Sequence, residues 1–357
     1  MTMGRALQGL AGSYGDEAYN YGVIGLALIM LIYGTLGGIR AIAWTDVIQG
    51  SVLIIGLFIL LILLVDQFGP LSDATELIAA SPDIFKIARP ASPMLREWLS
   101  YVIVLGMGGA LYPHAIQRIY AAKSRLTLNR SLAVMAFLPF TTALIAVIAG
   151  IYALAYVPGL EGAATDQVLA RLLRIIQENS LFGYAVVVLI FSAVLAALMS
   201  TADSAMLSIS SMFTKDIYAV HVNPGASQSE LTKIGKRCSW IIVGVLVVFA
   251  ILLKNQVSLI ALIDRKFDVL VQLAPAFMLG IHMPFLKRVP VLIGLVVGLL
   301  IALGLAFGPF HFVIAGKVWG LHPGLYGLVV NTVIAVAGST LRVRPESFIP
   351  KSCRAAT

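Results

Sequence analysis

The amino-acid sequence predicts an all-α, polytopic membrane helix bundle. Hydrophobic residues make up 59% of its 357 positions and charged residues only 12%, which is far from the composition of a soluble globular chain. The apolar runs are also too many and too long for buried core helices, since a helix of about 20 residues crosses the hydrocarbon core of a bilayer. The net charge of +8 is scattered over short loops, which favours topology determinants and lipid-headgroup contacts over nucleic-acid binding.

Nine apolar segments are each about long enough to span a bilayer. They cover residues 22–39, 46–65, 98–119, 131–157, 182–212, 238–253, 267–285, 289–308 and 323–341. We therefore expect a single transmembrane domain over 22–341, an extracellular segment over 1–21 and a cytoplasmic tail over 342–357. More lysines and arginines fall on the side of the C-terminus, so the positive-inside rule places the N-terminus outside and the C-terminus in the cytoplasm. The sequence thus predicts a multi-pass protein of the cytoplasmic (inner) membrane.

The first two spans are joined by Tyr33-Gly-Thr-Leu-Gly-Gly-Ile-Arg-Ala-Ile-Ala-Trp-Thr-Asp-Val-Ile-Gln49. Gly37-Gly38 predicts the end of one helix, and Thr45-Asp46 predicts the start of the next, with Asp46 as its N-cap. In this interpretation the string is a tight cytoplasmic turn that Trp44 anchors at the membrane interface.

The third span contains Gly106-Met-Gly-Gly-Ala-Leu-Tyr-Pro113, and three glycines with a proline weaken a transmembrane helix. A broken helix near the bilayer midplane is typical of a binding site, because it frees backbone groups to address a ligand. The alternative is close helix packing with a proline kink. His114 follows directly and is either a titrating group or a satisfied interfacial residue.

The fifth span contains Leu195-Ala-Ala-Leu-Met-Ser-Thr-Ala-Asp-Ser204, which puts hydroxyls and a carboxylate into an apolar helix. On a helix the small and hydroxyl-bearing residues share one arc of about 100°, with Asp203 on its flank. The arc holds Ala197, Ser200, Thr201, Ser204, Ser208 and Ser211. Such a stripe is either a close helix–helix seam or an oxygen cage for a hard monovalent cation.

The string between the first two spans closely resembles the Gly-Gly-x-x-Ala-Val-x-Trp-Thr-Asp-x-x-Gln signature of the sodium:solute symporter family. The fifth span resembles that family's sodium-site helix, including its exit Ser211-Met-Phe-Thr-Lys-Asp-Ile-Tyr218. A third match is Ala115-Ile-Gln-Arg-Ile-Tyr-Ala-Ala-Lys-Ser124 at the cytoplasmic end of the third span. The three matches follow the family's order and cover most of the chain.

The resemblance implies the leucine-transporter-type fold, in which two inverted five-helix repeats enclose a midplane site. The first two spans are then the last two helices of the first repeat, and spans three to seven form the second repeat. The first core helices are not found in this sequence, so we expect a longer protein or a separate N-terminal fragment that carries them. The implied function is sodium-coupled symport of a small organic solute, such as an amino acid or a carboxylate, by alternating access.

The resemblance also implies the site residues. The family's principal sodium site maps onto the Ala197 carbonyl and the hydroxyls of Ser200 and Thr201. A second cation site, present in some members, maps onto Asp46, Asp203 and Ser204. Asp203 departs from the serine often found there, and it either binds this cation, pairs with a nearby arginine or takes a proton.

Candidate substrate contacts are Gly108, Gly109 and Tyr112 in the broken third span, and Gln272 in the seventh span. Sugar-transporting relatives carry bulky aromatics near the two glycines, which argues against a hexose. Sodium is the expected coupling ion, with no organic cofactor. Two other functions stay open, a sensory membrane module and a non-functional remnant. No nucleophile–base pair or metal-ligand cluster supports an enzyme, and the two cysteines, Cys238 and Cys353, do not suggest a disulfide framework.

Overall fold

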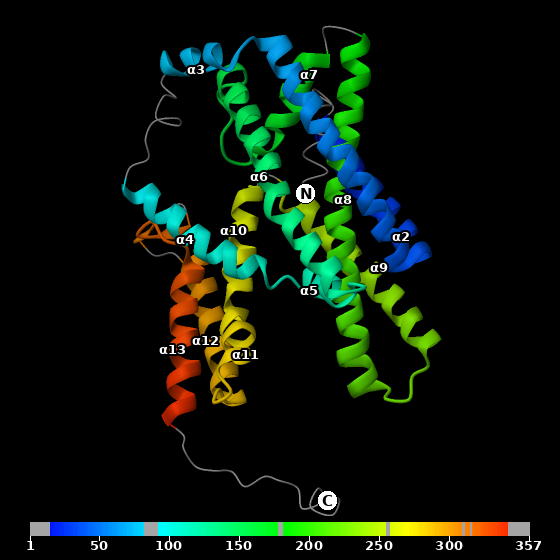
Figure 1. The fold of residues 1–357 in the computed structure, drawn as a ribbon, viewed down its shortest axis with the longest axis vertical. Coiled ribbons are helices and arrows are strands. Elements are labelled where there is room, and N and C mark those ends of the chain that lie inside the picture. The colour runs from blue at the N-terminus through cyan, green and yellow to red at the C-terminus, as the bar shows by residue number, and fades with distance from the viewer. Residues whose placement is uncertain are drawn as a thin grey trace, which may run out of the picture. The chain divides into compact units, whose positions relative to one another are not determined.

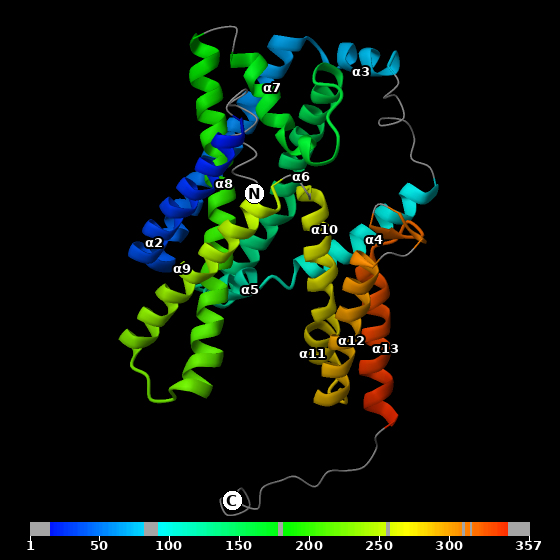
Figure 2. The same ribbon diagram turned by 180° about the vertical axis from the view of Figure 1, so that it is seen from behind.

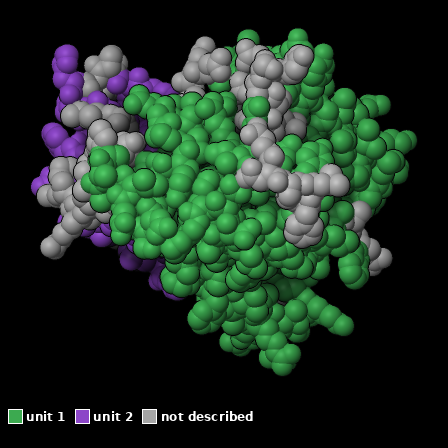
Figure 3. Space-filling model, turned by 90° about the horizontal axis from the view of Figure 1, so that it is seen from above, with its two compact units in different colours: residues 1–89, 113–262 green, residues 90–112, 263–357 purple. Residues whose placement is uncertain are grey.

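The computed structural model is built almost entirely of helices, as the sequence predicts (Figure 1). It describes residues 15–81, 92–177, 181–254, 258–308, 311–314 and 316–341. The chain forms two compact units, of which unit 1 contains residues 1–89 and 113–262 and unit 2 contains residues 90–112 and 263–357 (Figure 3).

The first two expected spans form one long helix, α2 (Gly15–Phe68), with a break at Gly38. Gly38 has φ 60° and ψ −164°, a conformation that glycine adopts without the strain of a Cβ atom. The helix stop at Gly37-Gly38 is therefore confirmed. The new start at Thr45-Asp46 is wrong, because the second span already runs from Ile42 to Phe68 and holds Asp46 in its interior. One glycine with a positive φ suffices to separate the two helices, so no longer turn is needed.

The other elements of unit 1 follow α2 in a bundle. They are α3 (Leu71–Ala79), α5 (Pro113–Tyr120), α6 (Arg125–Tyr156), η3 (Gly162–Gln167), α7 (Val168–Gln177), α8 (Leu181–Met212), η4 (Phe213–Val222) and α9 (Gln228–Leu252). In both ribbon views α8 runs beside α2 (Figures 1 and 2), and the two helices share apolar cores at both ends. One core includes Leu64, Tyr152 and Leu173, and the other includes Met30 and Met206. This packing fixes the polar face of α8 against α2.

Unit 2 consists of shorter and partly broken elements. They are α4 (Ser92–Gly109), most of α10 (Leu259–Leu270), η5 (Val271–Leu273), η6 (Pro275–Leu279), α11 (Gly280–His282), α12 (Arg288–Phe307), β1 (Val313–Ile314), β2 (Lys317–Val318) and α13 (Pro323–Leu341). β1 and β2 pair antiparallel, with Val313 opposite Val318. The apolar core joins α4 to the broken segment and to α13, through Val104, Phe267 and Leu328 among others.

Helices α12 and α13 lie side by side in both views (Figures 1 and 2) and approach each other through glycines. A Cβ atom added at Gly298 would lie 2.6 Å from Gln272 Oε1 and 2.7 Å from the carbonyl oxygen of Gly327. No side chain fits there. Small residues are what allows two helix backbones to pack this closely in a membrane protein.

Seven described helices are long and apolar enough to cross a membrane, or eight if α4 and α5 form one bent span. The expectation of nine spans is therefore too high for the described part of the chain. The third expected span is interrupted between Gly109 and Pro113, as its glycines predict. The seventh does not pass as a span, because it is divided among the end of α10, η5, η6 and α11.

Gly298 supplies a test of the close contact between α12 and α13. Gly298→Val should lower the free energy of unfolding by roughly 1–3 kcal/mol, the usual cost of overpacking. Gly304→Val on the same helix is the matched control, because a Cβ atom there meets nothing within 4 Å. The measurement is the thermal denaturation midpoint of the purified protein in detergent. Equal midpoints for the two variants would contradict the packing assigned to Gly298.

Candidate cation and substrate sites

One turn of α8 carries the residues assigned to the principal sodium site. The Thr201 hydroxyl donates to the Ala197 carbonyl at 3.3 Å, so these two oxygens lie on the same face of the helix. The Ser200 hydroxyl donates to an Asp46 carboxylate oxygen. Both hydroxyls thus have their proton engaged and their lone pairs available, and neutral or anionic oxygens are the ligands that hard cations prefer. The donor set fits a monovalent cation such as sodium.

Asp46 lies at the centre of a polar network in unit 1. One of its carboxylate oxygens accepts from Ser200, and the other forms an ion pair with Arg118 on α5. The same Arg118 guanidinium donates to the Ser204 hydroxyl. The side chain of Asp46 is 15% exposed and that of Arg118 is 53% exposed, so water screens the pair only in part. The structure therefore brings Asp46 and Ser204 together around a cationic side chain.

Asp203 has a different partner. It is fully buried, and its Oδ2 accepts a hydrogen bond from the Tyr33 hydroxyl of α2. Its Oδ1 has no hydrogen-bond partner among the described residues. Among those residues Asp203 forms no ion pair, so pairing with an arginine, one of the alternatives for Asp203, is not found, and Arg118 pairs with Asp46 instead.

Farther along α8, the polar stripe serves as a helix–helix seam. The Ser208 hydroxyl donates to Gln117 Oε1 on α5 at 2.8 Å, and the Ser204 hydroxyl accepts from Arg118 of the same helix α5. The seam interpretation is therefore confirmed at Ser204 and Ser208, and the cation cage stays a prediction for Ala197, Ser200 and Thr201. The turn at Ala197 to Thr201 offers oxygens, while Ser204 and Ser208 bind α5.

The broken helix of unit 2 packs against Phe267 of α10. Gly108 is buried, and a Cβ atom there would lie 3.3 Å from the Val271 nitrogen and 3.4 Å from Phe267 Cδ1. Close packing, the alternative considered for this segment, thus accounts for Gly108. A Cβ atom at Gly109 would meet Phe267 at 3.9 Å, and the Tyr112 ring lies edge-on to Phe267 at 5.8 Å.

Gln272 is fully buried within unit 2. Its Nε2 donates to the backbone carbonyl oxygens of Asp268 at 3.1 Å and Gly324 at 2.8 Å, and its backbone carbonyl accepts from Asn331 Nδ2 at 2.7 Å. These bonds join η5 to α13. The structure thus places this candidate substrate contact inside the packing of three elements.

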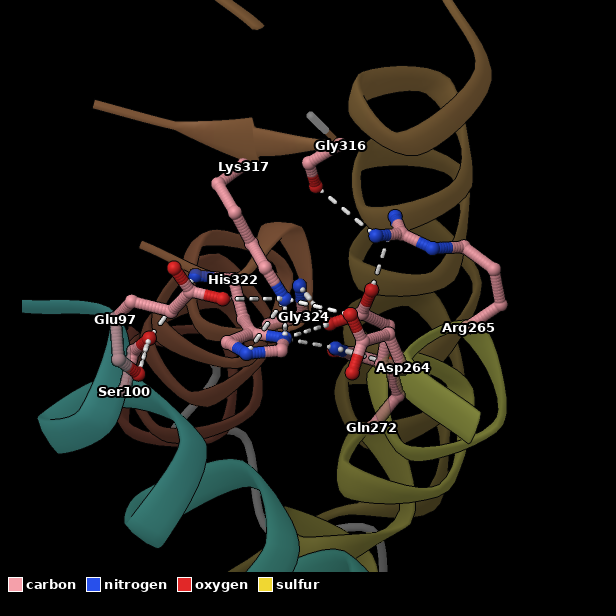
Figure 4. A network of polar contacts seen from close by, with 10 residues as sticks. Glu97, Ser100, Asp264, Arg265, Gln272, Gly316, Lys317, His322 and Gly324 are labelled. Carbon is pink, nitrogen blue, oxygen red and sulfur yellow. Dashed lines mark hydrogen bonds and ion pairs between the residues drawn. The ribbon is translucent and has the colours of Figure 1, made fainter. Parts of the chain in front are cut away.

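Unit 2 also contains a polar network, which joins the hairpin formed by β1 and β2 to α10 (Figure 4). Lys317 on β2 reaches Asp264 Oδ2 at 2.7 Å and His322 Nε2 at 2.8 Å, with Glu97 at 3.6 Å. Arg265 pairs with Asp268 at 3.1 Å, and Asp268 Oδ1 accepts from the Gly324 nitrogen at 2.8 Å, at the start of α13. In this buried network, carboxylates face cationic side chains at short range.

Sequence reasoning did not assign roles to Arg118, Tyr33 or the Lys317 network. Arg118 and Tyr33 do lie inside the two strings that resemble the family, which is the signal that could have drawn attention to them. The Lys317 network has no such signal, because its members are spread from Glu97 to His322 in the sequence.

The family model for the sodium:solute symporter family matches residues 14–298, and the chain belongs to this family. It is 28% identical over 327 residues to the sodium/pantothenate symporter of Haemophilus influenzae, an alignment that covers 87% of this chain and 64% of that protein. It is 25% identical over 334 residues to the sodium/proline symporter of Escherichia coli, covering 91% of this chain and 63% of that one.

The fold also resembles a solved structure, titled as the substrate-bound outward-open state of a Na+-coupled sialic acid symporter with a novel Na+-site. The TM-score is 0.71 at 21% identity, covering 95% of this chain and 70% of the other. The all-α, leucine-transporter-type bundle is thereby confirmed. The family and these relatives are transporters rather than enzymes. The chain spans less than two thirds of the length of the two curated relatives.

The Tyr33–Asp203 contact can be tested by removing one hydroxyl. Tyr33→Phe leaves both carboxyl oxygens of a buried group without a partner, which should lower the free energy of unfolding by about 1–3 kcal/mol. Tyr21→Phe on the same helix is the control, because Tyr21 is 74% exposed. Thermal denaturation of the two purified variants is the measurement. A Tyr33→Phe midpoint equal to that of Tyr21→Phe would show that the hydroxyl does not hold Asp203.

Proposed function

We propose that this chain acts in sodium-coupled symport of a small organic solute across the cytoplasmic membrane, with its N-terminus outside and its C-terminus inside. The observation that carries the proposal is the turn of α8 that holds the Ala197 carbonyl, the Thr201 hydroxyl bonded to it and the Ser200 hydroxyl. Membership of the sodium:solute symporter family and the names of the relatives support sodium as the coupling ion.

In this proposal the three oxygens of α8 bind the co-transported sodium ion. The Ser200 hydroxyl also donates to Asp46 in the second half of α2. A movement of Ser200 on sodium binding is therefore transmitted directly to α2. Coupling requires that sodium bind one conformation of the protein better than another, since equal affinity shifts no equilibrium. The contact between Ser200 of α8 and Asp46 of α2 is suited to this coupling, because Ser200 is at the same time a proposed sodium ligand.

The second cation site is proposed around Asp46 of α2 and Ser204 of α8. Asp203 is a neighbouring acidic residue on α8. Arg118 now supplies the positive charge at Asp46. A sodium ion at Asp46 therefore competes with the guanidinium group of Arg118. In this proposal the ion binds when Arg118 moves away from Asp46. For the solute, we propose contacts from Tyr112 and the backbone at Gly109, with Gly108 and Gln272 holding the surrounding helices in place.

The sodium proposal is tested with Thr201→Ala. Loss of one hydroxyl ligand should raise the sodium concentration for half-maximal protection against thermal denaturation roughly tenfold, because a dehydrated cation loses a charge-assisted contact. Ser192→Ala, an exposed serine of the same helix, should leave it unchanged. The titration replaces choline chloride by sodium chloride at constant ionic strength. Equal stability of the unmodified protein in both salts would refute sodium binding.

The second cation site is tested with a pair of variants that change charge but little volume. Asp46→Asn should lower the Hill coefficient for sodium in the same assay, since the amide keeps the hydrogen-bond acceptor but removes the charge. Arg118→Gln should increase the apparent sodium affinity, because the competing guanidinium is gone. If both variants titrate like the unmodified protein, Asp46 and Arg118 form only a structural ion pair.

A further inference from the structure

Helix α10 carries one cation that the described structure leaves without a carboxylate. Its charged residues are Asp264, Arg265, Lys266 and Asp268. Asp264 pairs with Lys317 of the hairpin (Figure 4). Asp268 pairs with Arg265. Lys266 forms no ion pair with any described acidic residue, and its side chain is exposed.

The ammonium group of Lys266 is nevertheless held in place. Its Nζ lies 4.6 Å from the centroid of the Phe267 ring and 5.2 Å from that of Tyr112. Aromatic faces attract a cation electrostatically but do not use its N–H donors in ordinary hydrogen bonds. Lys266 is thus a positioned cation whose three donors stay available for an anionic ligand.

The position of Lys266 is next to irregular backbone. Tyr112 is the last residue of the interruption that follows α4, where the Leu111 nitrogen donates to the Gly108 carbonyl in a tight turn at 3.1 Å. Non-helical backbone within a membrane-spanning chain is tolerated where protein covers it or where it lines an aqueous cavity. An exposed lysine in such a chain likewise belongs at a cavity or at the interface, since charge in hydrocarbon is costly.

We propose that Lys266 binds the carboxylate of the transported solute, with Tyr112 and Phe267 orienting its ammonium group. This inference rests on the proposed function, in which the broken helix contacts the solute. It names the substrate class as small carboxylates. A carboxylate supplies the negative charge that Lys266 lacks, whereas a neutral solute of the same shape leaves Lys266 without an ion-pair partner.

The test compares each carboxylate with its uncharged amide in nanodiscs of neutral lipid. The probes are propionate against propionamide and benzoate against benzamide, in sodium chloride, and the readout is the concentration that gives half-maximal thermal protection. At least one carboxylate should protect the unmodified protein more strongly than its amide. Lys266→Met should weaken carboxylate protection about tenfold or more and remove this preference, while Lys266→Arg should retain part of it.

Lys254→Met is the matched control, because the Nζ of Lys254 also lies over an aromatic ring, 4.9 Å from the centroid of Tyr19. Neither Lys254 nor Tyr19 belongs to the broken helix or to α10. This variant should keep the full preference for carboxylates. The inference is overturned if Lys266→Met keeps the preference, if Lys254→Met loses it equally, or if no carboxylate exceeds its amide. Loss of stability of Lys266→Met only in nanodiscs with anionic lipid would instead assign the lysine to a headgroup phosphate.

Sodium protection, measured on the same samples, separates this inference from the proposed function. If sodium protects the unmodified protein but no carboxylate preference is found, the substrate class is wrong and the sodium proposal stands. If sodium does not protect, the proposed function fails whatever the behaviour of Lys266.

Discussion

The carboxylate of Asp46 is the contact on which the candidate site of unit 1 depends. It accepts from Ser200 with one oxygen and pairs with Arg118 through the other, so three helices meet at a single side chain. A carboxylate inside a membrane-spanning helix requires such partners, because hydrocarbon offers none. The same contacts place Ser200 and Ser204 where they can address a cation. Stability and the proposed function therefore rest on the same atoms.

Unit 2 satisfies its charges in another way. Lys317 and Arg265 each face a carboxylate of α10, and Gly324 donates to Asp268 at the start of α13. Removing one member of a buried pair leaves an uncompensated charge, which is far more costly than the pair is worth. The hairpin, α10 and α13 are thus tied together by electrostatics as well as by the glycine contacts of α12.

Much of the fold could be predicted from local patterns. The apolar runs gave most of the spans, and the glycines at 37 and 38 and around 108 gave two interruptions, because helix length and glycine conformation are properties of short segments. The start at Asp46 was mistaken because a good N-cap residue does not reveal that its carboxylate has a stronger partner elsewhere. Gln272 was chosen as a candidate substrate contact because its polarity was evident, whereas its bonds to Asp268 and Gly324 were not.

The contrast between Asp203 and Lys266 shows what the sequence could not decide. Both are ionisable residues without an ion-pair partner among the described residues, yet their surroundings differ. Asp203 is fully buried, and the Tyr33 hydroxyl is its hydrogen-bond donor. Lys266 is exposed, and its ammonium group lies over two aromatic rings. The carboxylate of Asp203 is enclosed among the helices of unit 1, whereas the exposed ammonium group of Lys266 can meet an anion. For that reason the lysine, and not the aspartate, carries the inference about the solute.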